Sequence, residues 1–305
     1  MMKRLLLFAL FALFILGPVF NQTNFTLSTV RQVEHPKLDE QFTDYQTVQL
    51  NHEAFYRYFQ ETEGHMRFSI QTDDRSPLGL NLAPYELRGG AFIRFTESET
   101  GRLDSSPATR TSVFRGSVRA SDGTSGEAVF TFDEQFVLGR WDEEGITYFL
   151  EPLWRFVPDA DHELYVVYKE EDAIMPLNYC GTDIPGREED DHNHAHQRGF
   201  GQAPQRSVGE CLLVELALAS DFELYQDFNN NATSVENFML NNLANVQTNY
   251  DDEFDDEILF EVVTTYIATC NATSCDPWTN STNAGTLLES FRNWGQGGGF
   301  GGVTY

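Results

Sequence analysis

Basic residues are scarce in this sequence. It has 20 Lys and Arg against 47 Asp and Glu, which gives a formal net charge of −27. Proteins that bind nucleic acid use clustered Lys and Arg to neutralise phosphates, and anionic membranes attract basic segments for the same reason. The charge balance therefore excludes nucleic acid as a partner and argues against an anionic membrane surface.

Long hydrophobic runs are also missing, except at the start. Met1-Met-Lys-Arg4 precedes an apolar run from Leu5 to Leu16, which Gly17-Pro18 closes. The run is too short to span a bilayer core of about 30 Å, and a basic start followed by an apolar run is typical of a secretory signal. Residues 1–20 are therefore interpreted as a signal peptide. We expect a secreted, extracellular protein with no membrane anchor in this part of the chain.

Cysteines are few: Cys180, Cys211, Cys270 and Cys275. Four cysteines in an exported chain allow three fully paired arrangements. One of them joins Cys180 to Cys211 and joins Cys270 to Cys275 across a short Asn-Ala-Thr-Ser loop. The alternative leaves Cys180 as a lone thiol with a role of its own, and Cys211 then needs a cysteine beyond Tyr305.

The first half of the sequence is rich in β-strand signals. Short runs of alternating apolar and polar residues recur between turn signals such as Asp122-Gly123. The runs are 91–95, 112–119, 127–132, 136–141, 146–150 and 163–168. They predict an antiparallel β-domain within residues 21–182, best defined over 90–172. A short helix is expected at 51–61.

An acidic stretch follows at residues 183–209. It combines Asp and Glu with Gly, Gln and Pro, a composition typical of a solvated linker. Any of its arginines is a candidate site for proteolytic processing. Its alternating histidines His192, His194 and His196 would lie on one side of an extended segment, as transition-metal binding requires. The plainer interpretation is that they are incidental histidines in the linker.

Beyond the linker the hydrophobic pattern changes. Residues 212–219 are nearly all apolar, as expected for a strand covered on both faces. Apolar residues then recur at helical spacing over 235–250. Thr233 and Glu236 have the spacing of a capping box at the start of that helix.

The same order then repeats. A second strand is predicted at 258–268 and a second helix at 287–294. Strand, helix, strand, helix implies right-handed crossovers and a mostly parallel sheet with flanking helices. The predicted fold class is therefore α+β overall, with a β-rich domain followed by an α/β domain.

Several of these stretches carry a family resemblance. In the first half they are Phe114-Arg-Gly-Ser-Val-Arg119, Phe136-Val-Leu-Gly-Arg-Trp141, Gly145-Ile-Thr-Tyr-Phe-Leu-Glu-Pro-Leu153 and Tyr165-Val-Val-Tyr-Lys-Glu-Glu-Asp172. Together they resemble the propeptide of reprolysin-type (adamalysin, ADAM-like, peptidase M12B) metalloproteases. In the second half, 214–225 resembles the first strand of the catalytic domain of that family, and 242–250 and 286–294 resemble its first two helices.

The resemblance implies a zinc endopeptidase of the metzincin clan that is made as a latent precursor. In that family the three histidines of H-E-x-x-H-x-x-G-x-x-H hold zinc, and the Glu is the general base. The sequence does not contain this motif, so no catalytic residue is assigned. The zinc ligands are expected beyond Tyr305, and residues 210–305 are expected to be the N-terminal part of the α/β metzincin catalytic domain.

The resemblance also gives two residues candidate metal roles. The thiolate of Cys180 would occupy the open zinc position and displace the attacking water, which keeps the precursor latent; the alternative is a structural disulfide. Glu215 resembles a calcium-binding Glu of some reprolysin-type domains. A Glu inside an apolar strand is costly unless it is paired or metal-bound, so a buried Arg or hydroxyl partner is the alternative.

The sequence thus predicts a secreted zymogen. Its parts are a signal peptide (1–20), a propeptide (21–182), a linker with the activation cleavage (183–209) and an incomplete catalytic domain (210–305). The expected reaction is hydrolysis of internal peptide bonds, with Zn²⁺ and also Ca²⁺ as cofactors and with extracellular protein substrates and an activating protease as partners. The alternative is a secreted, non-catalytic inhibitory or binding module.

Overall fold

The computed structural model describes residues 23–30, 32–72, 77–98, 100–174, 212–254, 256–270 and 276–301. The strands are β1 (Thr23–Thr29), β2 (Gln46–Gln49), β3 (Met66–Thr72), β4 (Leu78–Pro84), β5 (Arg88–Glu97), β6 (Leu103–Pro107), β7 (Val113–Arg119), β8 (Ser125–Phe132), β9 (Val137–Glu143), β10 (Ile146–Pro152), β11 (Leu164–Lys169), β12 (Leu212–Ser220) and β13 (Ile258–Ala268). The helices are α1 (Pro36–Asp39), α2 (His52–Glu61), α3 (Phe222–Asp227), α4 (Ala232–Phe254) and α5 (Ala284–Gln296), with single 3₁₀ turns at Leu153–Arg155 and Glu170–Asp172.

Within these ranges nine strands close into a barrel in the order β1-β2-β11-β10-β9-β8-β7-β4-β3. Neighbouring strands are antiparallel except for β1 and β3, whose parallel pairing closes the barrel. Closure leaves none of these strands with an open edge, so their backbone hydrogen-bonding groups are paired along both sides.

Aromatic rings fill the barrel. Phe68, Phe114, Phe130 and Phe132 are buried in it and meet edge to face or stacked. Helix α2 adds Phe55 and Phe59 to this cluster, and both rings stack on Phe132 with centroids 6.1 and 6.2 Å apart. The alternation of apolar and polar residues that predicts the strands is therefore the alternation between the barrel core and its surface.

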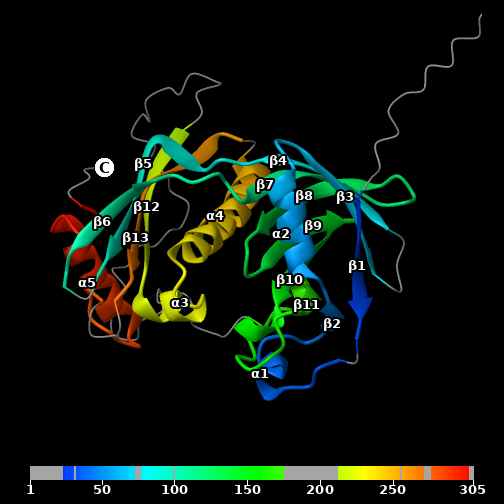
Figure 1. Ribbon diagram of the computed structural model, residues 1–305, viewed down its shortest axis with the longest axis horizontal. Helices are drawn as coiled ribbons and strands as arrows, with labels where there is room; N and C mark the ends of the chain where they lie inside the picture. Colours follow the sequence, from blue (N-terminus) through cyan, green and yellow to red (C-terminus); the bar gives the residue numbers. More distant parts are fainter. Residues whose placement is uncertain are drawn as a thin grey trace, which may run out of the picture.

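The strands outside the barrel form a four-stranded sheet in the order β12-β13-β5-β6, called the shared sheet below. β12, β13 and β5 run parallel, and β6 returns antiparallel to β5. Its strands come from both sides of the linker: β5 and β6 form a hairpin between barrel strands β4 and β7, while β12 and β13 follow the linker. Figure 1 shows the cyan hairpin beside the yellow and orange strands.

Helix α4 lies between the barrel and the shared sheet (Figure 1). Its apolar residues Leu240, Leu243 and Ala244 pack with Val129 of the barrel and Val262 of β13 in one buried cluster. α5 covers the far side of the sheet, where Trp294 packs on Tyr266 with ring centroids 4.8 Å apart. In the described parts of the chain no helix is both long and apolar enough to cross a membrane.

The predicted elements are present, but the predicted fold class is wrong. The chain does not form a separate β-domain followed by the N-terminal half of an α/β metzincin domain that builds its sheet from its own strands. It forms a closed barrel beside a mixed sheet that both halves of the sequence build. The physical reason is that β13 has two edges to satisfy, and β5 from the predicted propeptide pairs with the edge that β12 leaves open. The domain boundaries proposed from sequence stay predictions.

Gly116 provides a test of the barrel packing. It lies on β7 opposite Leu82, and a Cβ at this position would press on the backbone carbonyl oxygen of Asn81 and lie 3.0 Å from the Cα of Leu82. Because backbone cannot swing aside, Gly116→Ala is expected to lower the free energy of unfolding by about 1–3 kcal/mol, measured by urea denaturation.

The matched control is Gly90→Ala, another glycine in a strand. A Cβ at Gly90 meets nothing within 4 Å, so the expected change is about 0.5 kcal/mol or less. Equal changes in the free energy of unfolding for the two substitutions would show that the close contact of β7 with β4 does not contribute to the stability of the barrel.

Candidate functional site

The feature that links the two halves of the chain is the edge of β13. Thr264, Thr265 and Tyr266 are in register with Ile93, Arg94 and Phe95 of β5, respectively. Additional hydrogen bonds tie the ends of this pairing: the Val262 N–H donates to the carbonyl of Leu87 at 2.7 Å, and the Thr269 N–H donates to that of Glu97 at 3.0 Å. The hairpin therefore binds the second half of the chain by strand addition, in which the backbone supplies the affinity.

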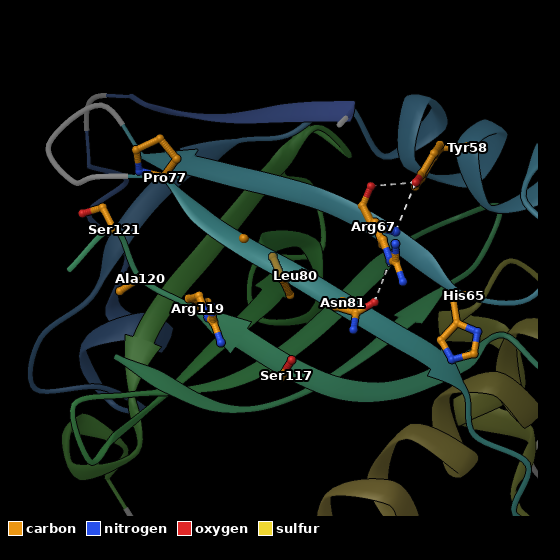
Figure 2. Close-up of a pocket in the computed structure, with 11 residues that line it drawn as sticks. Tyr58, His65, Arg67, Pro77, Leu80, Asn81, Ser117, Arg119, Ala120 and Ser121 are labelled. Carbon is orange, nitrogen blue, oxygen red and sulfur yellow. Dashed lines mark hydrogen bonds between the residues drawn. The ribbon is translucent and has the colours of Figure 1, made fainter. Parts of the chain in front are cut away.

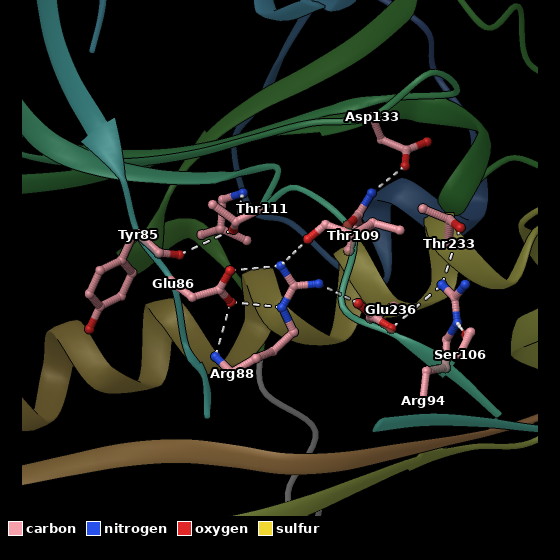
Figure 3. A network of polar contacts seen from close by, with 12 residues as sticks. Tyr85, Glu86, Arg88, Arg94, Ser106, Thr109, Thr111, Asp133, Thr233 and Glu236 are labelled. Atoms are coloured by element: carbon pink, nitrogen blue, oxygen red, sulfur yellow. Dashed lines mark hydrogen bonds and ion pairs between the residues drawn. The ribbon is translucent and has the colours of Figure 1, made fainter. Parts of the chain in front are cut away.

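A buried ion cluster lies where the hairpin meets α4 (Figure 3). Arg88 of β5 is 6% exposed and Glu236 of α4 is 1% exposed, and Arg88 Nη1 donates to Glu236 Oε1 at 2.7 Å. Arg94 Nη1 approaches Glu236 Oε2 at 3.5 Å. Glu86 accepts from Arg88 Nε at 2.7 Å and from Nη2 at 2.8 Å, and the Thr109 carbonyl also accepts from Nη2 at 2.8 Å.

The cluster depends on contacts across the interface. Burial raises the pKa of the Glu236 carboxyl, and the charges of Arg94 and Arg88 oppose that shift. Glu236 is the only acidic residue that α4 contributes to the pair of arginines. Both of its cations come from the hairpin, and a buried carboxylate that lacks a cation is one of the costliest arrangements in a protein interior.

A second group of charges connects the other end of α4 to the barrel. Arg115 of β7 contacts both Glu127 of β8 and Asp251 of α4. Burial lowers the pKa of Arg115, but the two carboxylates outweigh it and leave that pKa above its ordinary value. Gln247 donates to Asp251 at 2.6 Å, and its side-chain oxygen accepts from the Phe260 N–H of β13 at 2.7 Å. This end of α4 is therefore fixed to the barrel and to the shared sheet at once.

A third group surrounds the start of α4. Asp133, in the turn between β8 and β9, accepts from Ser234 Oγ and from Asn237 Nδ2, both at 2.8 Å. Burial raises the pKa of Asp133, and these hydrogen bonds, with one from the Gln135 N–H, limit the shift. One turn further along α4, Asn241 Oδ1 accepts a hydrogen bond from Thr131 Oγ1 of β8 at 2.9 Å. Three buried polar residues of α4, Ser234, Asn237 and Asn241, thus find partners on the barrel.

The sequence did not single out this interface. Glu236 fits a capping box with Thr233, but in the structure Asn231 Oδ1 accepts from the Thr233 and Ser234 N–H groups, and Glu236 faces Arg88. The capping-box prediction is therefore wrong. A signal was present, because α4 carries several polar residues among its apolar ones, yet nothing local in the sequence identifies their partners.

The structure places one of the two candidate metal residues. Cys180 and the histidines of the linker lie outside the described residues. Glu215 lies on β12, directly opposite Glu261 of β13, and it is exposed. Neither a buried Arg nor a hydroxyl partner is needed to explain an exposed carboxylate, and its calcium role stays a prediction.

The other predicted site residues are the cysteines 270 and 275. Cys270 is buried against Tyr266 and Phe300 at the end of the shared sheet, and Cys275 lies outside the described residues, so their pairing stays a prediction. Within the ranges that the structure covers, no three His, Cys, Asp or Glu side chains come together to hold a metal ion.

The buried ion cluster gives a direct prediction. Glu236→Gln keeps the shape of the side chain but leaves Arg88 and Arg94 without their shared counter-charge. We expect the free energy of unfolding to fall by about 3–5 kcal/mol in urea denaturation. The control is Glu86→Gln, because the Glu86 side chain is 44% exposed and its loss is expected to cost about 1 kcal/mol or less. A similar, small effect of both substitutions would contradict a structural role for the buried cluster.

Comparisons with known proteins find only a remote structural similarity. No model of a protein family matches it, and no curated protein matches it. Among solved structures, the crystal structure of metalloproteinase-II from Bacteroides fragilis is similar over 77% of this chain, with 10% identity and a TM-score of 0.29. The chain spans 61% of the length of that bacterial chain. A likeness of this size carries no argument about function.

Proposed function

We propose that this chain belongs to the precursor of a secreted zinc metalloendopeptidase, in which the barrel serves as an inhibitory propeptide. The observation that carries the proposal is the strand addition of the β5–β6 hairpin to β13, together with the buried contact of Arg88 with Glu236. A propeptide has to bind its own enzyme part tightly and specifically until it is cut away. The interface has the contacts for that role.

The interface combines two kinds of contact that serve such binding. Backbone pairing along β5 gives affinity, because the N–H and carbonyl groups of β5 and β13 form hydrogen bonds with each other where the two strands are in register. The charges of Arg88, Arg94 and Arg115 give specificity, because each meets a carboxylate from α4 that is buried or largely buried. The family resemblance of 114–172 to a metalloprotease propeptide supports the same assignment.

Latency in this proposal has two components. The barrel holds the second half of the chain through the shared sheet, and Cys180, in the sequence between β11 and β12, would supply a thiolate to the zinc of the catalytic domain in the uncleaved precursor. The described residues do not form a metal site, so no step of peptide hydrolysis is derived from them. Cleavage within 183–209 would cut the covalent connection between the two halves. The shared sheet and the ion pairs would still hold the barrel, so full activity requires that the barrel is then degraded or displaced.

The test uses the complete open reading frame, secreted from a eukaryotic cell and assayed on a quenched fluorescent protein substrate. We expect the uncleaved protein to be silent. Cleavage within 183–209, followed by degradation or displacement of the barrel, is expected to produce activity that a zinc chelator removes. Cys180→Ala is expected to bring the uncleaved precursor close to the activity of the cleaved form, because no thiolate then competes with water for the metal.

Cys211→Ala is the matched control. If Cys180 caps the zinc, only Cys180→Ala activates the precursor. If the two cysteines form a structural disulfide, both substitutions have the same effect and the thiolate role is wrong. A folded enzyme part that has been cleaved and freed from the barrel, yet shows no chelator-sensitive activity, would refute the enzyme proposal and leave the non-catalytic inhibitory or binding module.

A further inference from the structure

A groove lies on the outer face of the barrel. It crosses β3, β4 and β7 beside the end of α2 and has a cavity volume of about 700 Å³ (Figure 2). Its lining residues are Tyr58, His65, Arg67, Pro77, Gly79, Leu80, Asn81, Ser117, Arg119, Ala120 and Ser121. A volume of this size accommodates a ligand of several linked rings.

The charge of the groove is opposite to that of the protein. Among the described residues that line the groove are Arg67, Arg119 and His65, and none of these described residues is Asp or Glu, on a chain with 47 acidic and 20 basic residues. By contrast, Arg88 and Arg115 at the α4 interface each contact two carboxylates. Among the described residues neither Arg67 nor Arg119 has an ion-pair partner. A local pair of uncompensated guanidinium groups favours an anionic ligand.

The register of the strands fixes how these groups are arranged. Arg67, Asn81 and Ser117 lie side by side across β3, β4 and β7, because Arg67 pairs with Asn81 and Asn81 pairs with Ser117. In the next row on the same face, Gly79 pairs with Arg119. The glycine has no side chain, so the surface between the two arginines is hollow.

Arg67 is held in place from two sides. Its Nε donates to Asn81 Oδ1 at 3.1 Å, and the Tyr58 hydroxyl donates to the Arg67 carbonyl at 2.9 Å (Figure 2). The Nη1 and Nη2 groups of Arg67 have no hydrogen-bond partner in the described parts of the chain. A guanidinium that is oriented by Nε and open at both Nη groups is prepared to bind a planar or tetrahedral anion through two hydrogen bonds.

The backbone under the groove is already used. β3, β4 and β7 each pair with a strand on both sides within the closed barrel. A peptide therefore finds no strand edge to extend, and its own amide groups would have to be satisfied by side chains alone. The available side chains are guanidinium, imidazole, amide and hydroxyl groups, which match sugar hydroxyls and the acidic groups of a saccharide.

We propose that this groove binds an acidic saccharide that carries sulfate or carboxylate groups. Arg67 and Arg119 hold two of its anionic groups, and Asn81 and Ser117 bond to the hydroxyls between them. The site is independent of the proposed propeptide role, because none of its residues contacts α4 or the shared sheet in the interactions described above. The binding is local, since the net charge of −27 repels a polyanion from the rest of the surface.

The test measures binding of a heparin-derived sulfated tetrasaccharide to the full chain by isothermal titration calorimetry. We expect the tetrasaccharide to bind, and the double variant Arg67→Gln/Arg119→Gln to bind about tenfold or more weakly, because each lost charge-assisted hydrogen bond is costly. The matched control is Arg102→Gln/Arg292→Gln, which removes the same charge from two exposed arginines outside the groove and is expected to leave the dissociation constant within about twofold.

Two further ligands define the specificity. An uncharged tetrasaccharide and a hexaglutamate peptide are both expected to bind at least about tenfold more weakly than the sulfated tetrasaccharide. Absence of heat with the sulfated tetrasaccharide, equal binding by the groove variant and the control variant, or tighter binding of hexaglutamate would each overturn the proposal. Far-ultraviolet circular dichroism checks that both double variants keep the barrel.

Discussion

The arrangement of the two halves of the chain depends on backbone hydrogen bonding along both edges of β13. β12 pairs with one edge and β5 with the other, although β5 comes from the opposite side of the linker. An unpaired edge on a strand this long and this apolar would expose a row of backbone groups and attract other chains. The hairpin removes that exposure within the same molecule. Everything placed around the shared sheet follows from it, including the position of α4 against the barrel.

Helix α4 shows what this pairing makes possible. One of its faces is apolar and packs on β13 and on the barrel, yet it also carries Glu236, Asn237, Asn241 and Asp251 in buried positions. Such residues destabilise a helix interior unless they meet partners. Their partners are on barrel strands and on the hairpin, so α4 fits only where both are present. The specificity of the proposed propeptide therefore arises from polar groups that are satisfied in one arrangement.

Local pattern predicted much of the secondary structure. The alternation around β7 to β11 and the apolar run at β12 placed these strands within a few residues, because burial of one or both faces leaves a periodic trace in sequence. The assembly could not be predicted in this way. Closure of the barrel by parallel pairing of β1 with β3, and addition of β5 to β13, join segments far apart in the chain, and no local signal records them. The same holds for the groove, whose residues Tyr58, Arg67 and Arg119 come from three different elements.

The most direct test of this account asks whether the two halves stay together after the chain is cut. A specific protease site is inserted into residues 183–209 of the intact protein, the purified protein is cleaved, and the product is examined by size-exclusion chromatography and thermal unfolding. Both fragments are expected to co-elute at the volume of the uncut protein and to unfold in one cooperative transition, since they share a sheet and a buried ion cluster. Fragments that separate without denaturant, or that unfold in two independent transitions, would contradict it.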